Sequence, residues 1–230
     1  MTMKRAGMSD RRAVILQWLQ IVAGLLVFAF GVHLTIYANI GLAPWDCLGM
    51  GISNHTPLNY GLSMTVMALV ILGIDLLLGE KIGFGTVLDA LLTGNFVQMF
   101  NDWSPLPANE NTLAGIAIML VGFAFMAVGM MLYMRCAQGC GPRDSLLLGI
   151  GKRLRRLPIG LVEILLWAAV LLAGWLLGGP VGIGTVISTL GAGAVMQGIY
   201  TLLHFEPRRI RQRSIGEVAQ ILGRKRRPGA

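Results

Sequence analysis

Six apolar runs, each long enough to cross a lipid bilayer, constrain this chain more than any other feature. A helix that crosses the bilayer needs about 20 mostly apolar residues. The runs lie at 13–36, 60–79, 83–100, 113–134, 158–178 and 182–203. Only 13% of the residues are charged and 55% are hydrophobic, which excludes an ordinary soluble domain. The sequence therefore predicts an all-α, polytopic membrane protein with a single transmembrane domain over residues 1–205.

The positive charges predict the orientation of these spans. All 19 Lys and Arg residues lie before or at the start of the first run, in the connections 80–82 and 135–157, or after residue 204. With six crossings these segments share one side of the membrane, and cytoplasmic segments are the ones that carry an excess of Lys and Arg. The sequence thus predicts a multi-pass protein with both termini in the cytoplasm and a basic cytoplasmic tail at 206–230.

The sequence repeats itself at an offset of 98 to 99 residues. The matched positions include Gly41 with Gly139, Pro44 with Pro142, Asp46 with Asp144, the Gly-Thr-Val sequences at 85–87 and 184–186, and Gln98 with Gln197. The two copies cover about 13–100 and 113–203 and contain three spans each. An odd number of spans turns the second copy upside down relative to the first, as in many secondary transporters. We therefore expect two inverted three-helix repeats, with the third and sixth spans, which are rich in small residues, crossing at the axis between them.

A short motif is the most specific match within this repeat. It reads Gly41-Leu-Ala-Pro-Trp-Asp-Cys-Leu in the first copy and Gly139-Cys-Gly-Pro-Arg-Asp-Ser-Leu in the second. A duplicated Gly-x-x-Pro-x-Asp-x-Leu motif, in a small six-span protein with a basic tail, resembles the YczE/YyaS/YitT group of bacterial integral membrane proteins. The resemblance extends to about residue 204 and implies a location in the bacterial cytoplasmic (inner) membrane, but it implies no substrate.

Each motif predicts a short helix, over about 44–53 and 142–151. Proline suits the first turn of a helix, and an aspartate two residues later can accept hydrogen bonds from the free amides of that turn. A helix of this length is about 15 Å long, which is about half the thickness of the bilayer core. Two arrangements are left open: the helices dip to the middle of the membrane from opposite faces, or they lie flat at the interfaces.

The charged residues of the two motifs indicate a binding site. Asp46 and Asp144 either cap their helices or line a polar cavity together with Arg143, since ionisable groups within a membrane are usually functional. Arg143 and the helix amino termini favour a carboxylate or phosphate, whereas the two aspartates favour an amine, so a zwitterionic or weakly charged metabolite fits both. The candidate substrate-binding residues are Pro44, Trp45, Asp46, Asp89, Gln98, Pro142, Arg143, Asp144 and Gln197.

Other polar residues within the spans have structural as well as functional interpretations. Asp89 either couples transport to protons or forms hydrogen bonds between helices. Asp75 is expected to reach the inner surface, and Glu163 is expected to pair there with Arg155 or Arg156. No group of His, Cys and carboxylate side chains has the spacing of metal ligands, so the sequence predicts no metal and no other cofactor.

These features predict a transporter that moves a small polar or charged metabolite by alternating access around the two short helices. A non-transporting membrane scaffold or regulator is the alternative, because small outer loops and a basic tail are compatible with it. An enzyme is disfavoured and no catalytic residue is predicted, since no nucleophile and base are placed together. The expected partners are the lipid bilayer and an unidentified small molecule; nucleic acid is disfavoured because the basic segments are short, and oligomerisation is left open.

Overall fold

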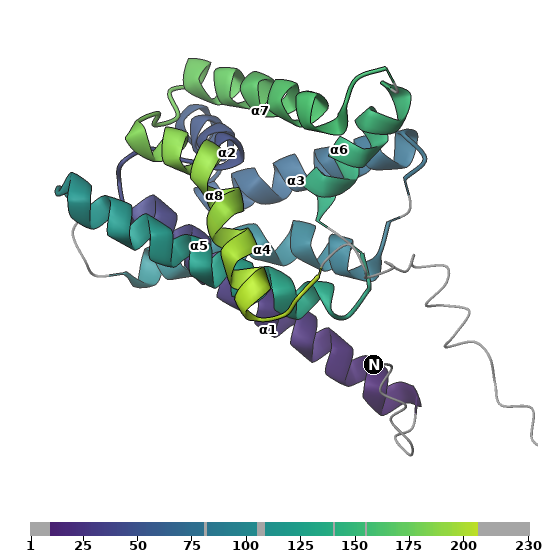
Figure 1. The fold of residues 1–230 in the computed structure, drawn as a ribbon. Helices are drawn as coiled ribbons and strands as arrows, with labels where there is room; N and C mark the ends of the chain where they lie inside the picture. The colour runs from purple at the N-terminus through teal and green to yellow at the C-terminus, as the bar shows by residue number, and fades with distance from the viewer. Residues whose placement is uncertain (1–9, 81, 105–108, 140, 155, 207–230) are drawn as a thin grey trace, which may run out of the picture.

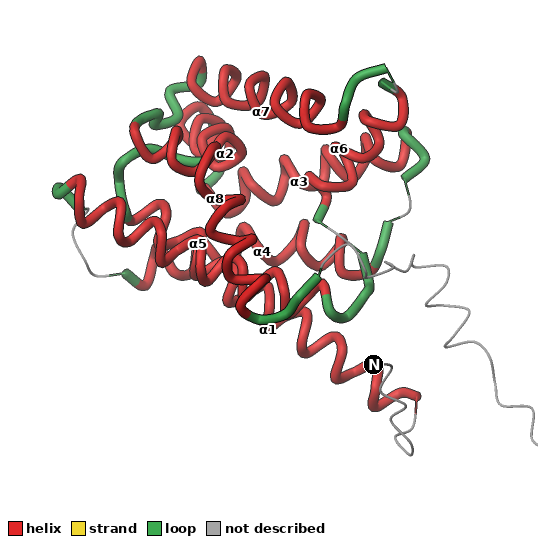
Figure 2. Tube along the Cα trace, in the orientation of Figure 1, coloured by secondary structure: helices red, strands yellow, loops and turns green. Residues whose placement is uncertain are grey.

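The computed structural model describes residues 10–80, 82–104, 109–139, 141–154 and 156–206, with side chains from residue 15 onward. These residues form eight helices and no strand (Figure 1, Figure 2). The helices are α1 (Asp10–Tyr37), α2 (Pro44–His55), α3 (Tyr60–Leu77), α4 (Phe84–Trp103), α5 (Thr112–Met134), α6 (Pro142–Arg153), α7 (Ile159–Leu176) and α8 (Ile183–Leu202). The predicted basic tail, apart from Glu206, lies outside the described residues.

The two short helices begin where the duplicated motif predicts. Pro44 and Pro142 occupy the first turns of α2 and α6, and each helix ends two residues beyond its predicted limit. The side chain of Asn59 starts α3 by accepting a hydrogen bond of 2.9 Å from the amide of Leu62, which satisfies one of the free amides of the first turn. The predicted all-α architecture is therefore confirmed, with every predicted run matching one helix.

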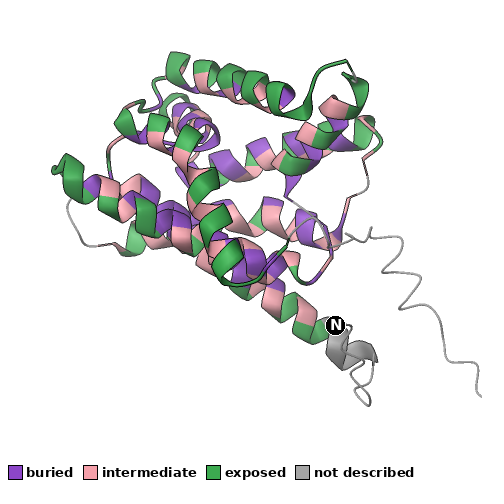
Figure 3. Cartoon of the chain, viewed as in Figure 1, coloured by how far each residue is buried: buried purple, intermediate pink, exposed green. Residues whose placement is uncertain are grey.

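Five of the described helices are long and apolar enough to cross a membrane: α1, α3, α5, α7 and α8. α4 matches the third apolar run but is not among them, because several polar and acidic residues lie between Asp89 and Asp102. Large apolar side chains point outward, such as Ile164 at 65% and Leu190 at 78% exposure, and Figure 3 shows exposed positions along much of α7. Such a surface is typical of helices surrounded by lipid.

α1 and α5 form the most extensive helix pair, and they meet through glycines. A methyl group added at Gly31 would lie 2.5 Å from the carbonyl oxygen of Gly122, and one added at Gly24 would lie 2.9 Å from that of Gly129. Backbones come this close only where side chains are absent. The expectation that the third and sixth spans form the central crossing is wrong: α4 packs on α1 and α3, and α8 packs on α5. The reason is that Gly94 of α4 faces α3.

Positions 98 or 99 residues apart have matching backbone geometry. Gly41 and Gly139 have φ angles of 112° and 115°, in the left-handed region that favours glycine. The same offsets relate two backbone hydrogen bonds, each 2.7 Å long: Gly85 donates to Gln138, and Gly184 donates to Ile40. Both bonds join the start of a long helix to the loop before a short helix of the other half.

One contact is not shared by the two halves. Gly61 of α3 and Gly94 of α4 touch through their backbones, because a methyl group added to either would lie 2.6 to 2.7 Å from the other's carbonyl oxygen. The equivalent residues of the second half, 99 positions later, are Gly160 of α7 and Gly193 of α8. A methyl group added to either would have no neighbouring atom within 4 Å. α3 therefore packs along α4, whereas α7 and α8 make no comparable contact.

Candidate functional site

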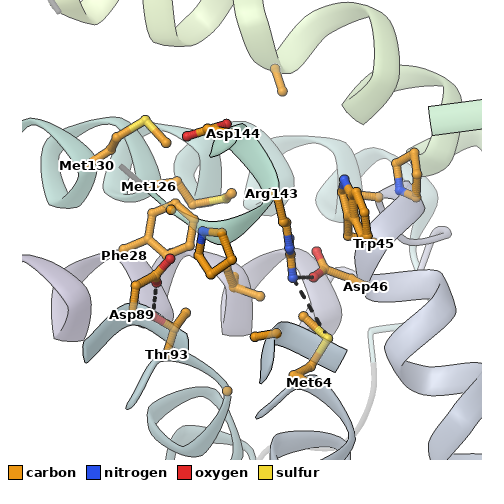
Figure 4. Close-up of a pocket in the computed structure, with 18 of the residues that line it drawn as sticks. Phe28, Trp45, Asp46, Met64, Asp89, Thr93, Met126, Met130, Arg143 and Asp144 are labelled. Carbon is orange, nitrogen blue, oxygen red and sulfur yellow. Dashed lines mark hydrogen bonds and ion pairs between the residues drawn. The ribbon is translucent and has the colours of Figure 1, made fainter. Parts of the chain in front are cut away.

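Residues from all eight helices line a cavity of about 240 Å³. The cavity lies at the amino-terminal ends of α2 and α6 (Figure 4). A cavity of about 150 Å³ holds benzene, and pockets for drug-sized ligands measure about 300–1,000 Å³. The space therefore suits a small metabolite. Much of its wall is apolar or aromatic, formed by Phe28, Phe123, Met126, Met130, Trp167 and Met196 among others.

Asp46, at the start of α2, is held by residues of two other helices. Tyr60 of α3 donates a hydrogen bond to its Oδ1 atom (3.1 Å), and the guanidinium of Arg143, on α6, lies 3.9 Å from the same oxygen. Arg143 also lies over the Trp45 ring, 5.4 Å from its centroid, and 3.9 Å from the sulfur of Met64 (Figure 4). Arg143 thus connects the ends of the two short helices across the cavity.

The other carboxyl groups of the cavity lie nearer to the start of α6. Thr93 donates a hydrogen bond of 2.5 Å to Oδ1 of Asp89. A methyl group added at Gly141 would lie 2.9 Å from Oδ2 of Asp89 and 3.8 Å from Oδ2 of Asp144, and Glu163 of α7 lines the same cavity. Within the described part of the chain, none of these three carboxyl groups forms an ion pair. Asp144 is exposed, whereas Asp46 is only 4% exposed.

The structure brings together seven of the nine predicted substrate-binding residues, which are Pro44, Trp45, Asp46, Asp89, Pro142, Arg143 and Asp144. Gln98 and Gln197 do not line the cavity. Gln98 accepts a hydrogen bond from the amide of Gly61 (3.2 Å) and donates one to Asp102 (2.7 Å), so it ties α4 to α3. Gln197 is exposed and donates to the hydroxyl of Thr201, one turn further along α8 (3.4 Å).

The two halves of the chain supply equivalent residues to this cavity. Besides the two motifs, seven pairs of lining residues are 98 or 99 positions apart: Phe28 and Met126, Val32 and Met130, Met64 and Glu163, Ala68 and Trp167, Asp89 and Ser188, Thr93 and Ala192, and Val97 and Met196. The pairs differ in chemistry, since an aspartate matches a serine and a methionine matches a glutamate. The cavity is therefore matched in position but not in charge.

Glu163 lines the cavity, although its sequence position predicted an ion pair at the inner surface. Its expected partner Arg155 lies outside the described residues, and no ion pair joins Glu163 to Arg156 in the part of the chain that the structure describes. Glu163 lines the cavity instead. Its position 99 residues after Met64, another lining residue, is the signal that the internal repeat offered.

Asp75 is enclosed by the protein. The residue is fully buried, and neither carboxyl oxygen has a hydrogen-bond partner among the described residues. The expectation that it reaches the inner surface is wrong, because α3 packs against α6 there, with Leu78 next to Gly149. Glu80 forms the ion pair at this end of α3 instead, 2.5 Å from the ammonium of Lys152.

Long apolar helices that expose large apolar side chains outward and enclose charged groups define a multi-pass membrane protein. The chain belongs to DUF6198, a family of unknown function whose sequence profile matches residues 15–201. This membership, together with two of the relatives below, confirms the resemblance to YczE and YyaS that the duplicated motif indicated.

Three relatives cover most of the chain. It is 30% identical over 191 residues to the uncharacterized membrane protein YczE of Bacillus subtilis (strain 168), covering 81% of this chain and 86% of the relative. It is 31% identical over 173 residues to an uncharacterized protein of Haemophilus influenzae, covering 75% and 78% of the two chains. It is 25% identical over 179 residues to the uncharacterized protein YyaS of Bacillus subtilis, covering 75% and 87%. No solved structure matches the chain.

Proposed function

We propose that this protein is a transporter in the cytoplasmic membrane of a bacterium, and that it moves a small polar or charged metabolite by alternating access to the cavity. The observation that carries the proposal is the lining, because two halves of one chain supply equivalent residues to one charged cavity. Binding sites of secondary transporters lie between internal repeats, near the middle of the membrane. Ionisable groups at that depth are costly to bury and usually serve a function.

In this transporter α4 also crosses the membrane, which raises the number of spans from five to six. Its 20 residues give a helix of about 30 Å, the thickness of the bilayer core. Its polar side chains turn to neighbouring helices: Asp89 lines the cavity, Gln98 bonds α3, and Asn101 forms a 2.6 Å hydrogen bond with His33 of α1. Six spans also leave every Lys and Arg on the cytoplasmic side, with both termini there.

The proposal also includes an inverted repeat. Three spans per half give the second half the opposite orientation, so an approximate twofold axis lies in the plane of the membrane. The α1–α5 contact fits such an axis. In the repeat, Gly24 is equivalent to Gly122 and Gly31 is equivalent to Gly129, so the contact of Gly24 with Gly129 is equivalent to the contact of Gly122 with Gly31. These are the two glycine contacts that hold α1 against α5.

The unequal packing of the two halves supports alternating access. With the amino terminus in the cytoplasm, the tight contact of Gly61 and Gly94 lies toward the outer side, and the unfilled space at Gly160 and Gly193 lies toward the inner side. The structure then corresponds to an inward-open state, and the exposure of Asp144 fits this assignment. In the outward-open state the two halves exchange their packing, so that α7 closes on α8 and α3 parts from α4.

A disulfide between cysteines placed at Gly160 and Gly193 tests the proposal. The native Cys47, Cys136 and Cys140 are replaced by alanine in this variant. Disulfide formation requires Cβ atoms about 3.5–4.5 Å apart. α7 and α8 make no contact here comparable to that of α3 and α4. We expect the bond to form slowly in membranes under mild oxidation as the protein visits the outward-open state, and to appear as a gel shift that a reductant reverses.

The matched control pairs Gly160→Cys with Gly73→Cys, because Gly73 of α3 also has no atom within 4 Å. This pair does not approach in either state, so no bond is expected. If the pair at Gly160 and Gly193 also fails to join over hours of oxidation, the protein does not close on its inner side. A static scaffold would then be the better description.

A further inference from the structure

We propose that the cavity binds a small amphipathic organic cation, in which an amine or quaternary ammonium group is attached to an apolar body of about one ring. The inference deepens the proposed function by naming the substrate class, and it depends on that function only for movement of the ligand across the membrane.

The charge balance of the cavity favours a cation. Among the residues that the structure describes, four carboxyl groups line it, those of Asp46, Asp89, Asp144 and Glu163, against the guanidinium of Arg143. Arg143 is already paired with Asp46 at 3.9 Å, so its charge is not available to a ligand anion without breaking that pair. The other three carboxyl groups have no ion-pair partner in the described part of the chain. Within a cavity that lies inside the membrane, a ligand cation supplies the missing charge.

The position of two of these carboxyl groups depends on a glycine. A methyl group added at Gly141 would lie 2.9 Å from Oδ2 of Asp89 and 3.8 Å from Oδ2 of Asp144, so any side chain there would enter the space next to both. The φ angle of Gly141 is −58°, which every amino acid can adopt. The backbone conformation therefore does not require glycine here; the missing side chain instead lets the carboxyl group of Asp89 lie against the start of α6, near that of Asp144.

The walls of the cavity fit an organic rather than an inorganic cation. Phe28, Phe123 and Trp167 present aromatic rings, and Met126 and Met130 present polarisable sulfur atoms. The contact of Arg143 with the Trp45 ring at 5.4 Å shows that this cavity already holds a cation against an aromatic face. No group of three or more His, Cys, Asp or Glu side chains among the described residues is arranged to hold a metal ion.

The volume limits the ligand to a single ring or a short chain. At about 240 Å³ the cavity exceeds the roughly 150 Å³ that holds benzene, but it is smaller than pockets for drug-sized ligands. A charged headgroup beside Asp89 and Asp144 leaves room for one ring against the methionines and aromatic residues.

Binding to the purified full-length protein in lipid nanodiscs tests the inference. The probes share one ring and differ in charge: benzyltrimethylammonium is cationic, benzyl alcohol is neutral and benzoate is anionic. We expect saturable, calorimetrically detectable binding of benzyltrimethylammonium and at least about tenfold weaker binding of the other two. Tighter binding of benzoate would overturn the inference in favour of an anion site, and equal binding of all three would show a merely apolar cavity.

Two substitutions and one control test whether the cation binds in the cavity. Asp144→Asn and Gly141→Ala should each weaken benzyltrimethylammonium binding at least about tenfold, the first by removing charge and the second by displacing the carboxyl group of Asp89. Asp102→Asn, at an exposed position outside the cavity, is the matched control and should bind as the wild type does. Unchanged affinity in both cavity variants would overturn the inference. Each variant must be folded, as shown by a single size-exclusion peak. If Asp144→Asn does not fold, Gly141→Ala alone tests the inference.

Failure of transport and failure of binding are distinguishable. Binding of the cation without uptake into proteoliposomes would retain the site and remove the transport proposal. Movement between states, seen as the disulfide at positions 160 and 193, without cation binding would retain alternating access and remove the substrate class.

Discussion

The guanidinium of Arg143 lies 3.9 Å from the carboxylate of Asp46, and this pair joins α6 of one half of the chain to α2 of the other. The two residues come from copies of one motif, in which Arg143 occupies the position equivalent to Trp45. The contact therefore depends on a difference between the copies rather than on their similarity. Two copies of the first motif would bring two aspartates to the cavity without the cation that pairs one of them.

Removing Arg143 should destabilise the protein because it leaves Asp46 buried without its cation. Breaking a fully buried pair costs about 3–5 kcal/mol and an exposed one about 0–1 kcal/mol. The Arg143 side chain is 36% exposed, so we expect a loss of about 2 kcal/mol for Arg143→Gln, between those limits. Thermal unfolding in nanodiscs measures it.

A second substitution separates this effect from lost packing. In Asp46→Asn with Arg143→Gln the unpaired charge is absent, so the double variant should be more stable than Arg143→Gln alone. Arg156→Gln, at an exposed position, is the control and should leave the unfolding temperature unchanged. A double variant with the summed loss of both single variants would show that the two side chains do not interact.

Leucine at two equivalent glycines should have opposite effects on stability. Gly94→Leu drives a side chain into the backbone of Gly61, and overpacking of this kind costs about 1–3 kcal/mol or more. Gly193→Leu enters unfilled space, so its stability should stay within about 0.5 kcal/mol of the wild type. The second variant should nevertheless be inactive in flux assays, because α7 can no longer close on α8. Full flux through Gly193→Leu would argue against that closure.

The thiol of Cys136, in the loop after α5, should react only at high pH. Burial raises the pKa of this thiol to about 11, and the side chain is 5% exposed. The thiolate is the reactive form, so the fraction available at pH 8 is far below that of an ordinary cysteine. In a variant with Cys47 and Cys140 replaced by alanine, alkylation by iodoacetamide should therefore accelerate as the pH approaches 11. A midpoint near 8.5 would show that the thiol is open to solvent.

The six-span topology predicts which loops face outward. Thr56, between α2 and α3, and Arg156, between α6 and α7, are both exposed and lie on opposite sides of the proposed bilayer. A cysteine at Thr56 should react with a membrane-impermeant maleimide in intact cells, and one at Arg156 should react only after permeabilisation. Reaction at Arg156 in intact cells would mean that α4 does not cross, since five spans turn the second half over.

The positions of the helices could be predicted from the sequence better than the contacts between the helices. Pro44 and Pro142 mark helix starts through their own backbone chemistry, so the starts of α2 and α6 could be predicted locally. The burial of Asp75 could not, because it depends on α6 covering that face of α3. Hydropathy gives no facing direction for helices that are apolar all round, and for this reason the α1–α5 crossing was also missed.

In the candidate site, too, the repeat predicted several of the residues but not what each side chain contacts. The charged motif residues Asp46, Arg143 and Asp144 were predicted from the repeat, and the structure brings them to one cavity. Gln98 was predicted from the same repeat but bonds the backbone of Gly61, since a matched position does not determine what a side chain faces. Glu163 is the opposite case, because it was predicted outside the site and lies in it. Its charge suggested a surface ion pair, whereas its packing places it in the cavity.

Accessibility of the cavity from the two sides of the membrane is the most direct test of alternating access. Ala192 is a small lining residue, and a cysteine there would meet reagents that enter the cavity. Alternating access predicts that a membrane-impermeant methanethiosulfonate modifies Ala192→Cys when applied from either side, while Thr56→Cys reacts only from outside and Arg156→Cys only from inside. Modification of Ala192→Cys from one side alone, however long the exposure, would contradict a transporter and describe a fixed pocket.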